Sequence, residues 1–234
     1  MVTTQIPIVV LTLKGDAARR APLLAQLDAL GLRYELHYGI DGRAGVDDPP
    51  IDRAAIRAAL FRDLTDGEIA CALSHIAIWR GVTQSAVIVL EDDAIVGAPL
   101  AAFARATPPD IGLLLLDHQR AIVRRTGVTV GQARAYRLRI PAYLTTGYMI
   151  RPERAARMAA DSLPLRGPAD WPCDIVAFGA FALVPRIVDH PATDAGSTLA
   201  TARAARPAGR RSPRFLRPGY WRDVWIKRTG FRVS

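Results

Sequence analysis

The sequence predicts an α/β fold with a mainly parallel central sheet. Residues 86–90 are five consecutive apolar residues rich in β-branched side chains, which is typical of a strand buried on both faces. Residues 6–13 and 34–38 are two further strand candidates, and the leucines between them recur at helical spacing. A strand, a helix and a second strand in this order predict parallel pairing through a right-handed crossover.

Local signals predict the remaining elements along the chain. Asp16 is placed to cap a helix that ends at Gly31, and Thr65 with Glu68 forms the capping-box pattern of a helix running to about residue 83. The other expected elements are helices over 54–61 and 152–160, strands over 112–116, 145–150 and 181–188, and an antiparallel strand over 134–140. Together they predict one α/β domain over residues 1–200 and a tail over 201–234.

Three carboxylates directly follow the buried apolar strand. Glu91, Asp92 and Asp93 cannot be buried without counter-charge, so we expect them at the carboxyl end of the strand, facing water or a cation. That edge of an open α/β sheet is where ligands bind. Asp117 follows the next apolar run, and Gly147 marks a place where backbone must approach something closely. Carboxylates at strand ends suit a hard divalent cation that holds phosphates; the alternative for the triplet alone is a solvated acidic turn.

Other familiar sites are missing from the sequence. There is no P-loop signature, no glycine-rich dinucleotide fingerprint, no nucleophile elbow and no zinc-type spacing of cysteines or histidines. The two cysteines, Cys71 and Cys173, stand far apart, and no export signal precedes the first strand. We therefore expect reduced thiols and a cytoplasmic protein.

The positive charge of the chain gathers near its end. The net charge is +9 and the pI is near 10.3, which predicts a polyanionic partner: nucleic acid, an anionic membrane surface or a phosphorylated substrate. One acid, Asp223, stands among ten basic residues: Arg203, Arg206, Arg210, Arg211, Arg214, Arg217, Arg222, Lys227, Arg228 and Arg232. The aromatic residues interleaved with them are Phe215, Tyr220, Trp221, Trp225 and Phe231. This mixture is typical of segments that dock on anionic membranes; the alternative is a basic tail without a target.

Several of these stretches resemble glycosyltransferase family 25, the lipooligosaccharide sugar transferases. The resemblance rests on residues 64–75, LTDGEIACALSH, followed by residues 88–93, IVLEDD. Residues 146–150 and 168–170 are similar to a later strand and a later acidic loop of the family. Thr12 stands where the family usually has asparagine. The resemblance covers roughly residues 6–200 and implies a GT-A-like, Rossmann-type nucleotide-sugar-binding fold.

The resemblance also implies an inverting transfer of a hexose, with galactose the expected sugar, from a UDP-sugar to a lipooligosaccharide or another surface glycan. A Mn²⁺ or Mg²⁺ ion on the diphosphate would neutralise the leaving group, held by Glu91 and Asp93. Asp92, Thr12 and Gly147 are the further expected donor contacts. Inversion needs a base for the acceptor hydroxyl, for which Asp170 is the first candidate and Asp174 the second.

Two histidines and two other function classes stay open at this point. His75 is expected to orient the acidic loop, the alternative being a structural histidine, and His190 is left open as a metal ligand. The competing functions are a nucleic-acid-binding protein, against which no binding motif is found, and a metal-dependent phosphate-handling hydrolase or nucleotidyltransferase. The leading hypothesis places the enzyme as a peripheral protein on the inner face of the cytoplasmic membrane.

Overall fold

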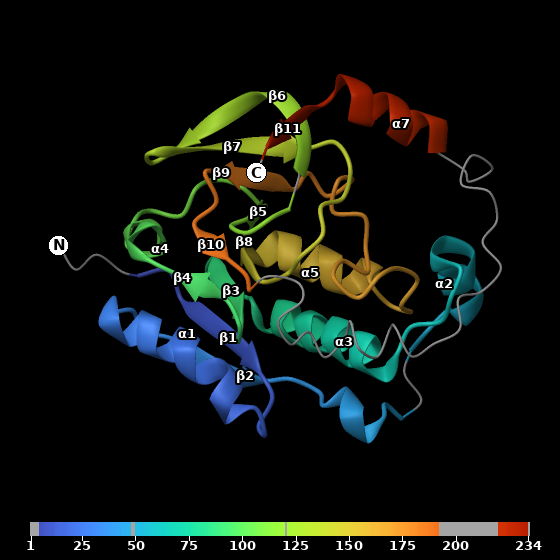
Figure 1. Ribbon diagram of the computed structural model, residues 1–234, viewed down its shortest axis with the longest axis horizontal. Helices are drawn as coiled ribbons and strands as arrows, with labels where there is room; N and C mark the ends of the chain where they lie inside the picture. The colour runs from blue at the N-terminus through green and yellow to red at the C-terminus, as the bar shows by residue number, and fades with distance from the viewer. Residues whose placement is uncertain (1–4, 48–49, 120, 192–219, 234) are drawn as a thin grey trace.

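A computed structural model describes residues 5–47, 50–119, 121–191 and 220–233 of the chain. They form an α/β fold around a nine-stranded sheet in the order β11-β6-β7-β9-β5-β8-β3-β1-β2 (Figure 1). The strands of this sheet are β1 (Ile8–Thr12), β2 (Glu35–Tyr38), β3 (Val87–Glu91), β5 (Leu113–Leu115), β6 (Ala121–Val130), β7 (Ala133–Leu138), β8 (Gly147–Ile150), β9 (Phe181–Val184) and β11 (Phe231–Val233). A two-stranded sheet pairs β4 (Ile95–Val96) with β10 (Val188–Asp189).

The sheet is mixed, so the prediction of a mainly parallel sheet is wrong. Only β1–β2, β1–β3 and β5–β9 pair in parallel, while β8 lies antiparallel between β3 and β5. The chain between β6 and β7 is a two-residue loop whose Gly131 has a φ of +56°, and so short a connection joins antiparallel strands only. The antiparallel strand expected over 134–140 is confirmed as β7, whereas its charged partner β6 has no clear apolar pattern and was missed.

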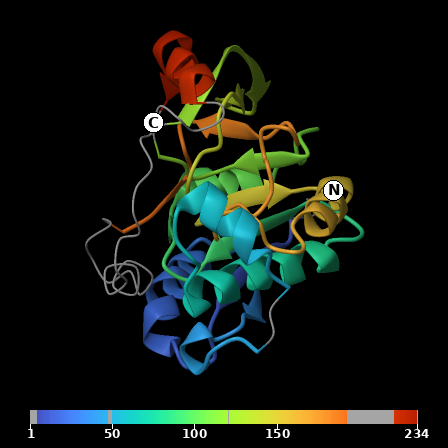
Figure 2. The ribbon, with the colours of Figure 1, turned by 90° about the vertical axis from the view of Figure 1, so that its right-hand side faces the viewer.

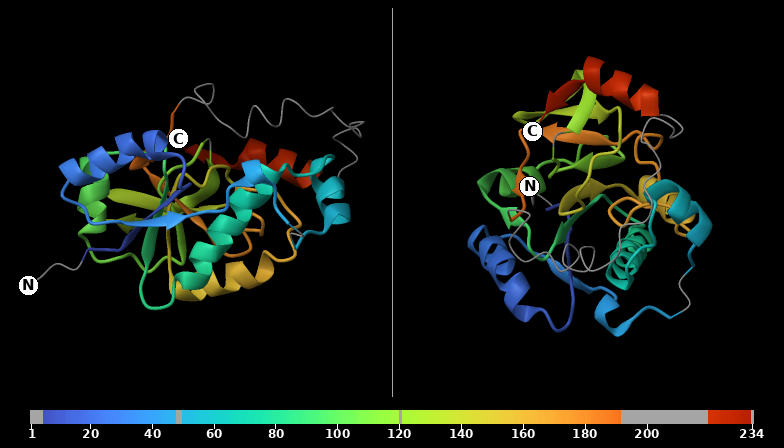
Figure 3. Two further views of the ribbon diagram at one scale, coloured as in Figure 1. Left: turned by 90° about the horizontal axis from the view of Figure 1, so that it is seen from below. Right: turned by 45° about the vertical axis from the view of Figure 1, so that its right-hand side comes forward.

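Helices cover both faces of the sheet (Figure 3). They are α1 (Ala17–Ala29), α2 (Arg53–Leu60), α3 (Asp66–Gly81), α4 (Ala98–Ala104) and α5 (Pro152–Asp161), with a short 3₁₀ helix, η1, over Gly42–Ala44. In β3, Val89 packs in the hydrophobic cluster under α3 and α5, whereas Ile88 and Leu90 pack in the cluster under α1 and α4. This alternation decides which helix each acid at the end of β3 faces.

The capping box at the start of α3 is confirmed. Thr65 Oγ1 accepts from the Glu68 amide and Glu68 Oε2 accepts from the Thr65 amide, at 3.2 and 2.9 Å. Arg62 holds the buried Glu68 carboxylate in a two-pronged ion pair. These hydrogen bonds and this ion pair fix the first turn of α3. Further along the same helix, His75 and Trp79 are buried in the core.

The described end of the expected tail belongs to the sheet. Helix α7 (Tyr220–Thr229) is followed by β11, which pairs antiparallel with β6, and Val233 is buried there (Figure 2). Trp221 and Trp225 are 68% and 62% exposed. The basic residues Arg203, Arg206, Arg210, Arg211, Arg214 and Arg217, and also Phe215, lie outside the described residues. In the part of the chain that is described, no helix has the length and apolar character needed to cross a bilayer.

Candidate active site

Three strand ends bring the predicted acids to one edge of the sheet. The Glu91 amide, at the end of β3, donates to Thr146 O at 2.9 Å, and the Asp117 amide, just after β5, donates to Gly147 O at 3.1 Å. Gly147 starts β8, which lies between β3 and β5. Glu91 and Asp117 thus flank the same short segment, at the carboxyl ends of two strands as expected from the sequence.

Gly147 is needed here for packing within the protein. A Cβ at this position would lie 2.7 Å from Val188 Cγ1, closer than side chains tolerate. The close approach inferred from the sequence is therefore an approach to β10. A direct contact of Gly147 with a donor stays a prediction.

Glu91 points to the α3 face and joins a buried hydrogen-bond chain. His75 Nε2 lies 3.2 Å from Glu91 Oε1, and His75 Nδ1 lies 2.9 Å from the Tyr148 hydroxyl. Trp79 Nε1 donates to the same hydroxyl at 2.8 Å, and the Thr145 hydroxyl donates to Glu91 Oε1. His75, Trp79 and Tyr148 are fully buried, so their orientation is fixed.

One assignment of protons satisfies this chain. Burial raises the pKa of Tyr148 well above its ordinary value, so the hydroxyl stays protonated and can donate a hydrogen bond to His75 Nδ1. His75 Nε2 then donates to the Glu91 carboxylate. Burial acts to raise the pKa of Glu91, but its hydrogen bonds with His75 and Thr145 and the positive charge of Arg19 outweigh burial, and the pKa of Glu91 is lowered. His75 therefore keeps Glu91 ionised and oriented.

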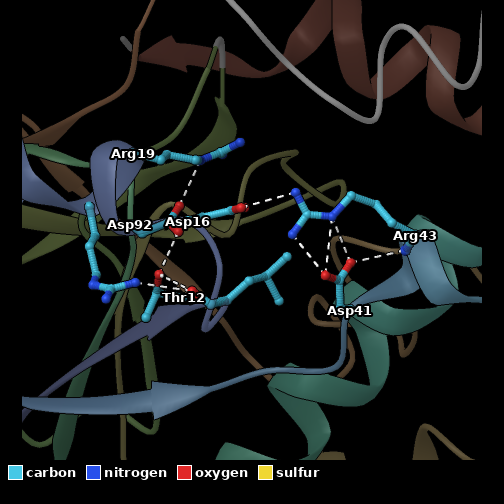
Figure 4. A network of polar contacts seen from close by, with 8 residues as sticks. Thr12, Asp16, Arg19, Asp41, Arg43 and Asp92 are labelled. Atoms are coloured by element: carbon cyan, nitrogen blue, oxygen red, sulfur yellow. Dashed lines mark hydrogen bonds and ion pairs between the residues drawn. The ribbon is translucent and has the colours of Figure 1, made fainter.

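Asp92 points to the opposite face, toward α1 (Figure 4). Its Oδ2 accepts from the Thr12 hydroxyl at 2.8 Å, and its Oδ1 accepts from Arg19 Nε at 2.7 Å. Arg19 also donates from Nη2 to Asp93 Oδ2, so one guanidinium bridges two adjacent acids. The Thr12 hydroxyl and the Asp92 carboxylate are thereby used within the protein, and their expected contacts with a donor stay predictions.

Arg19 is a site residue that sequence reasoning missed. It lies in the first turn of α1, 73 residues before Asp92, where a basic residue reads as part of a solvated helix face. Burial raises the pKa of Asp92, and burial together with the charges of Glu91 and Asp92 raises the pKa of Asp93, despite Arg19. The site therefore holds more negative charge than its one bridging guanidinium balances.

A second arginine, Arg43, fixes the loop segments that lie near Asp92. Arg43, in η1, donates to Asp16 Oδ1 at 3.0 Å and to both carboxylate oxygens of Asp41 (Figure 4). Asp16 precedes α1, and its side chain makes no capping hydrogen bond, contrary to the role expected from the sequence. Its carboxylate instead ties the loop after β1 to η1.

The two predicted bases occupy different positions on one loop. Asp170 Oδ2 accepts from the Leu144 amide at 3.3 Å, next to Thr145, which in turn donates to Glu91. Trp171, the residue after it, packs edge-on to the Tyr148 ring at 5.3 Å between centroids. Asp174 is exposed, and its Oδ1 accepts from the amides of Val176 and Ala177. Of the two, Asp170 is the one that hydrogen-bonds beside the Glu91 network, at the residue before Thr145.

The buried Asp117 and the half-buried His190 form a second hydrogen-bonded pair at the same edge. Asp117 Oδ2 lies 2.8 Å from His190 Nδ1, while Asp117 Oδ1 has no hydrogen-bond partner among the described residues and lies 3.8 Å from an Arg186 nitrogen. Burial raises the pKa of Asp117, although His190 and Arg186 act against it. Asp189 accepts from the backbone amide of His190 and is paired with Arg186.

Two groups among the described residues have the ligand atoms for a metal ion close together. One is Cys71, His75 and Glu91, and the other is Asp117, Asp189 and His190. Asp93 is in neither group. The charges around β3 nevertheless fit a divalent cation: Glu91, Asp92 and Asp93 carry −3 and Arg19 carries +1, which leaves −2. Glu91 and Asp93 also supply the carboxylate oxygens that Mn²⁺ and Mg²⁺ accept.

Two curated proteins are similar to part of this chain. Over 95 residues the chain is 35% identical to a "Glycosyltransferase 25 family member" of Aedes aegypti, and over 96 residues it is 36% identical to one of Anopheles gambiae. Each match covers 37% of this chain and 16% of the length of the curated relative.

Two solved structures show weaker likeness. Apo-form glycosyltransferase GlyE of Streptococcus pneumoniae TIGR4 matches 68% of this chain and 37% of its own, at 16% identity and a TM-score of 0.36. Mannose-1-phosphate geranyltransferase of Thermus thermophilus matches 80% and 76%, at 12% identity and 0.32. The family model described as glycosyltransferase family 25 (LPS biosynthesis protein) matches residues 5–174, which include Arg19, His75, Glu91 to Asp93 and Asp170, and the chain belongs to this family.

Proposed function

We propose that this glycosyltransferase transfers a hexose, galactose in the first instance, from a UDP-sugar to a lipooligosaccharide or another surface glycan, with inversion at the anomeric carbon. The observation that carries the proposal is the cluster of three carboxylates and one bridging guanidinium at the end of β3. Such a cluster suits a metal-bound diphosphate, because a divalent cation balances the acids and Arg19 can hydrogen-bond phosphate oxygens.

The residues around the end of β3 have separate roles in this proposal. Glu91 and Asp93 would hold the Mn²⁺ or Mg²⁺ ion, which supplies charge neutralisation for the departing UDP. Asp92 and Thr12 position Arg19 for the diphosphate, and His75 positions Glu91. Asp170 takes the proton from the acceptor hydroxyl, since it accepts from the Leu144 amide beside Thr145 and so lies next to this network.

The donor is tested by measuring sugar release and transfer with purified full-length protein and a panel of nucleotide sugars. We expect UDP-galactose with Mn²⁺ to raise the melting temperature and to be consumed faster when a glycan acceptor is added. Consumption that is independent of every acceptor would instead support the hydrolase or nucleotidyltransferase alternative. The family assignment disfavours that alternative and the nucleic-acid-binding one.

We also propose that the protein docks on an anionic membrane surface at the cytoplasmic face through α7. Trp221 and Trp225 expose their rings, and Lys227 and Arg228 are exposed in the last turn of the same helix. Aromatic rings partition to the lipid headgroups, and each cation near an anionic surface contributes about 1 kcal/mol. Truncation at residue 203 would be a poor test, because it also removes β11 from the sheet.

Replacing Trp221 and Trp225 together by serine is the sharper test of docking. We expect the variant to lose most of its binding to vesicles that contain anionic lipid, and to keep its activity on a soluble acceptor. High salt should weaken the binding of the unchanged protein, because it screens the cations. The exposed Tyr143, replaced by serine, is the control outside α7. Equal vesicle binding by the double variant and the unchanged protein would contradict the membrane role of α7.

A further inference from the structure

Three arginines surround Phe178 at the edge of the sheet opposite the candidate active site. Arg154 and Arg157, both on α5, place their guanidinium carbons 5.6 and 5.5 Å from the centre of the Phe178 ring. Arg137, at the end of β7, lies beside the next residue, with Nη2 3.5 Å from the position a Cβ would take on Gly179. Phe178 and Gly179 come just before β9. The three arginines that meet there come from two other elements, α5 and β7.

This edge is separate from the acids. Arg154 lies against Gly112, whose added Cβ would be 2.7 Å from Arg154 Nε, and Gly112 precedes β5. Asp117 follows the same strand at its other end. The Arg151 amide, just after β8, donates to Gly112 O, which places this cluster where β8 ends, whereas the active-site edge is where β8 begins.

None of the three guanidiniums has an acidic partner in the described part of the chain. Arg19, Arg43, Arg62 and Arg186 all pair with carboxylates, whereas within the described ranges no ion pair or side-chain hydrogen bond involves Arg137, Arg154 or Arg157. Arg154 Nε is buried, and the residues that the structure describes offer it no hydrogen-bond acceptor. Buried donors are nearly always paired, so the unpaired Arg154 Nε points to an acceptor that a ligand would supply.

The electrostatics of Arg154 agree with this. Burial lowers the pKa of Arg154 first, and repulsion from Arg157 and Arg137 lowers it further; Glu153 opposes them only weakly. The Phe178 ring face attracts the two helix guanidiniums and so helps to hold them together despite their like charge. A bound oxyanion would relieve the repulsion and supply hydrogen-bond acceptors.

We propose that Arg137, Arg154 and Arg157 around Phe178 form a binding site for a phosphate group, remote from the site of sugar transfer. Guanidinium groups are the side chains best matched to phosphate, because their planar N–H donors can bind two of its oxygens at once. The ligand is a phosphate dianion, either inorganic phosphate or the phosphomonoester group of a phosphorylated sugar. Phosphate binding at these arginines does not depend on which nucleotide sugar the enzyme uses.

The test is isothermal titration of the full chain with inorganic phosphate and with glucose 1-phosphate, at constant ionic strength. Arg157→Ala and Arg137→Ala remove exposed members of the cluster, so little buried packing is lost. Each is expected to weaken phosphate binding about tenfold, the effect of one charged hydrogen bond. Arg125→Ala on β6 removes the same charge from another exposed position and is expected to change nothing.

The two ligands distinguish the source of the phosphate. Equal affinity for both would assign the site to the free anion, and tighter binding of glucose 1-phosphate that Arg157→Ala abolishes would assign it to a phosphorylated sugar. The proposal is overturned if the unchanged protein binds neither ligand, or if Arg157→Ala and Arg125→Ala weaken binding equally. Equal weakening would mean that only the net charge of the protein attracts the anion.

Discussion

Replacing Asp93 by asparagine is expected to abolish sugar transfer and to leave the fold intact. The asparagine side chain would keep the shape of the aspartate but lose the carboxylate proposed to hold the divalent cation on the diphosphate. The metal's stabilisation of the leaving UDP would then be lost. Transfer assays with Mn²⁺, repeated in chelator for the unchanged protein, measure the effect.

Stability provides a second readout for this variant. Because burial and the neighbouring acids raise the pKa of Asp93, its ionisation costs stability once the pH exceeds the unfolded value, and that cost persists above the folded pKa. Removing the charge should therefore leave the melting temperature at pH 7 unchanged or higher. Asp110→Asn, at a fully exposed position, is the matched control. Full activity of the Asp93 variant, or of the unchanged protein in chelator, would contradict the metal assignment.

Replacing Asp170 by asparagine is expected to lower kcat by about a hundredfold or more, which is the range for losing a general base. The amide oxygen of the new side chain can still accept from the Leu144 amide, so the loop should keep its position. Donor binding should change little, because the base acts on the acceptor. Steady-state kinetics and donor titration separate the two effects.

The control for Asp170 is the same change at Asp174. An asparagine there can still accept from the Val176 and Ala177 amides, and we expect nearly full activity. A hundredfold loss at Asp174 with none at Asp170 would assign the base to Asp174. A collapse of donor affinity in the Asp170 variant would place Asp170 in the nucleotide or metal shell, through Thr145 and Glu91.

The features that were predicted correctly depend on neighbours in sequence. The capping box needs only Thr65 and Glu68, three residues apart, and both side chains make the expected bonds. The buried strand ending in Glu91 is recognisable because strands covered on both faces need an unbroken apolar run. The family resemblance rests on the same local stretches, and the family match covers them.

The errors have a common physical cause. β6 carries exposed arginines and is covered on one side by the short edge strand β11, which has three residues, so neither strand has enough buried side chains to show a pattern. Both were missed, and the pairing of β11 with β6 showed that part of the expected tail completes the sheet. Strand direction was misjudged for β8 because the apolar run of a strand says nothing about which way its neighbours point.

By itself the sequence determined the family, the acidic edge after β3 and the helix that carries His75. The tertiary structure decided what each acid does there, because alternate residues of an extended strand face opposite layers. Glu91 meets His75 of α3, and Asp92 meets Arg19 of α1, 73 residues away. It likewise gathered Arg137, Arg154 and Arg157 around one ring. Charges so far apart in sequence become neighbours only when the sheet brings their elements together, and no local pattern encodes that distance.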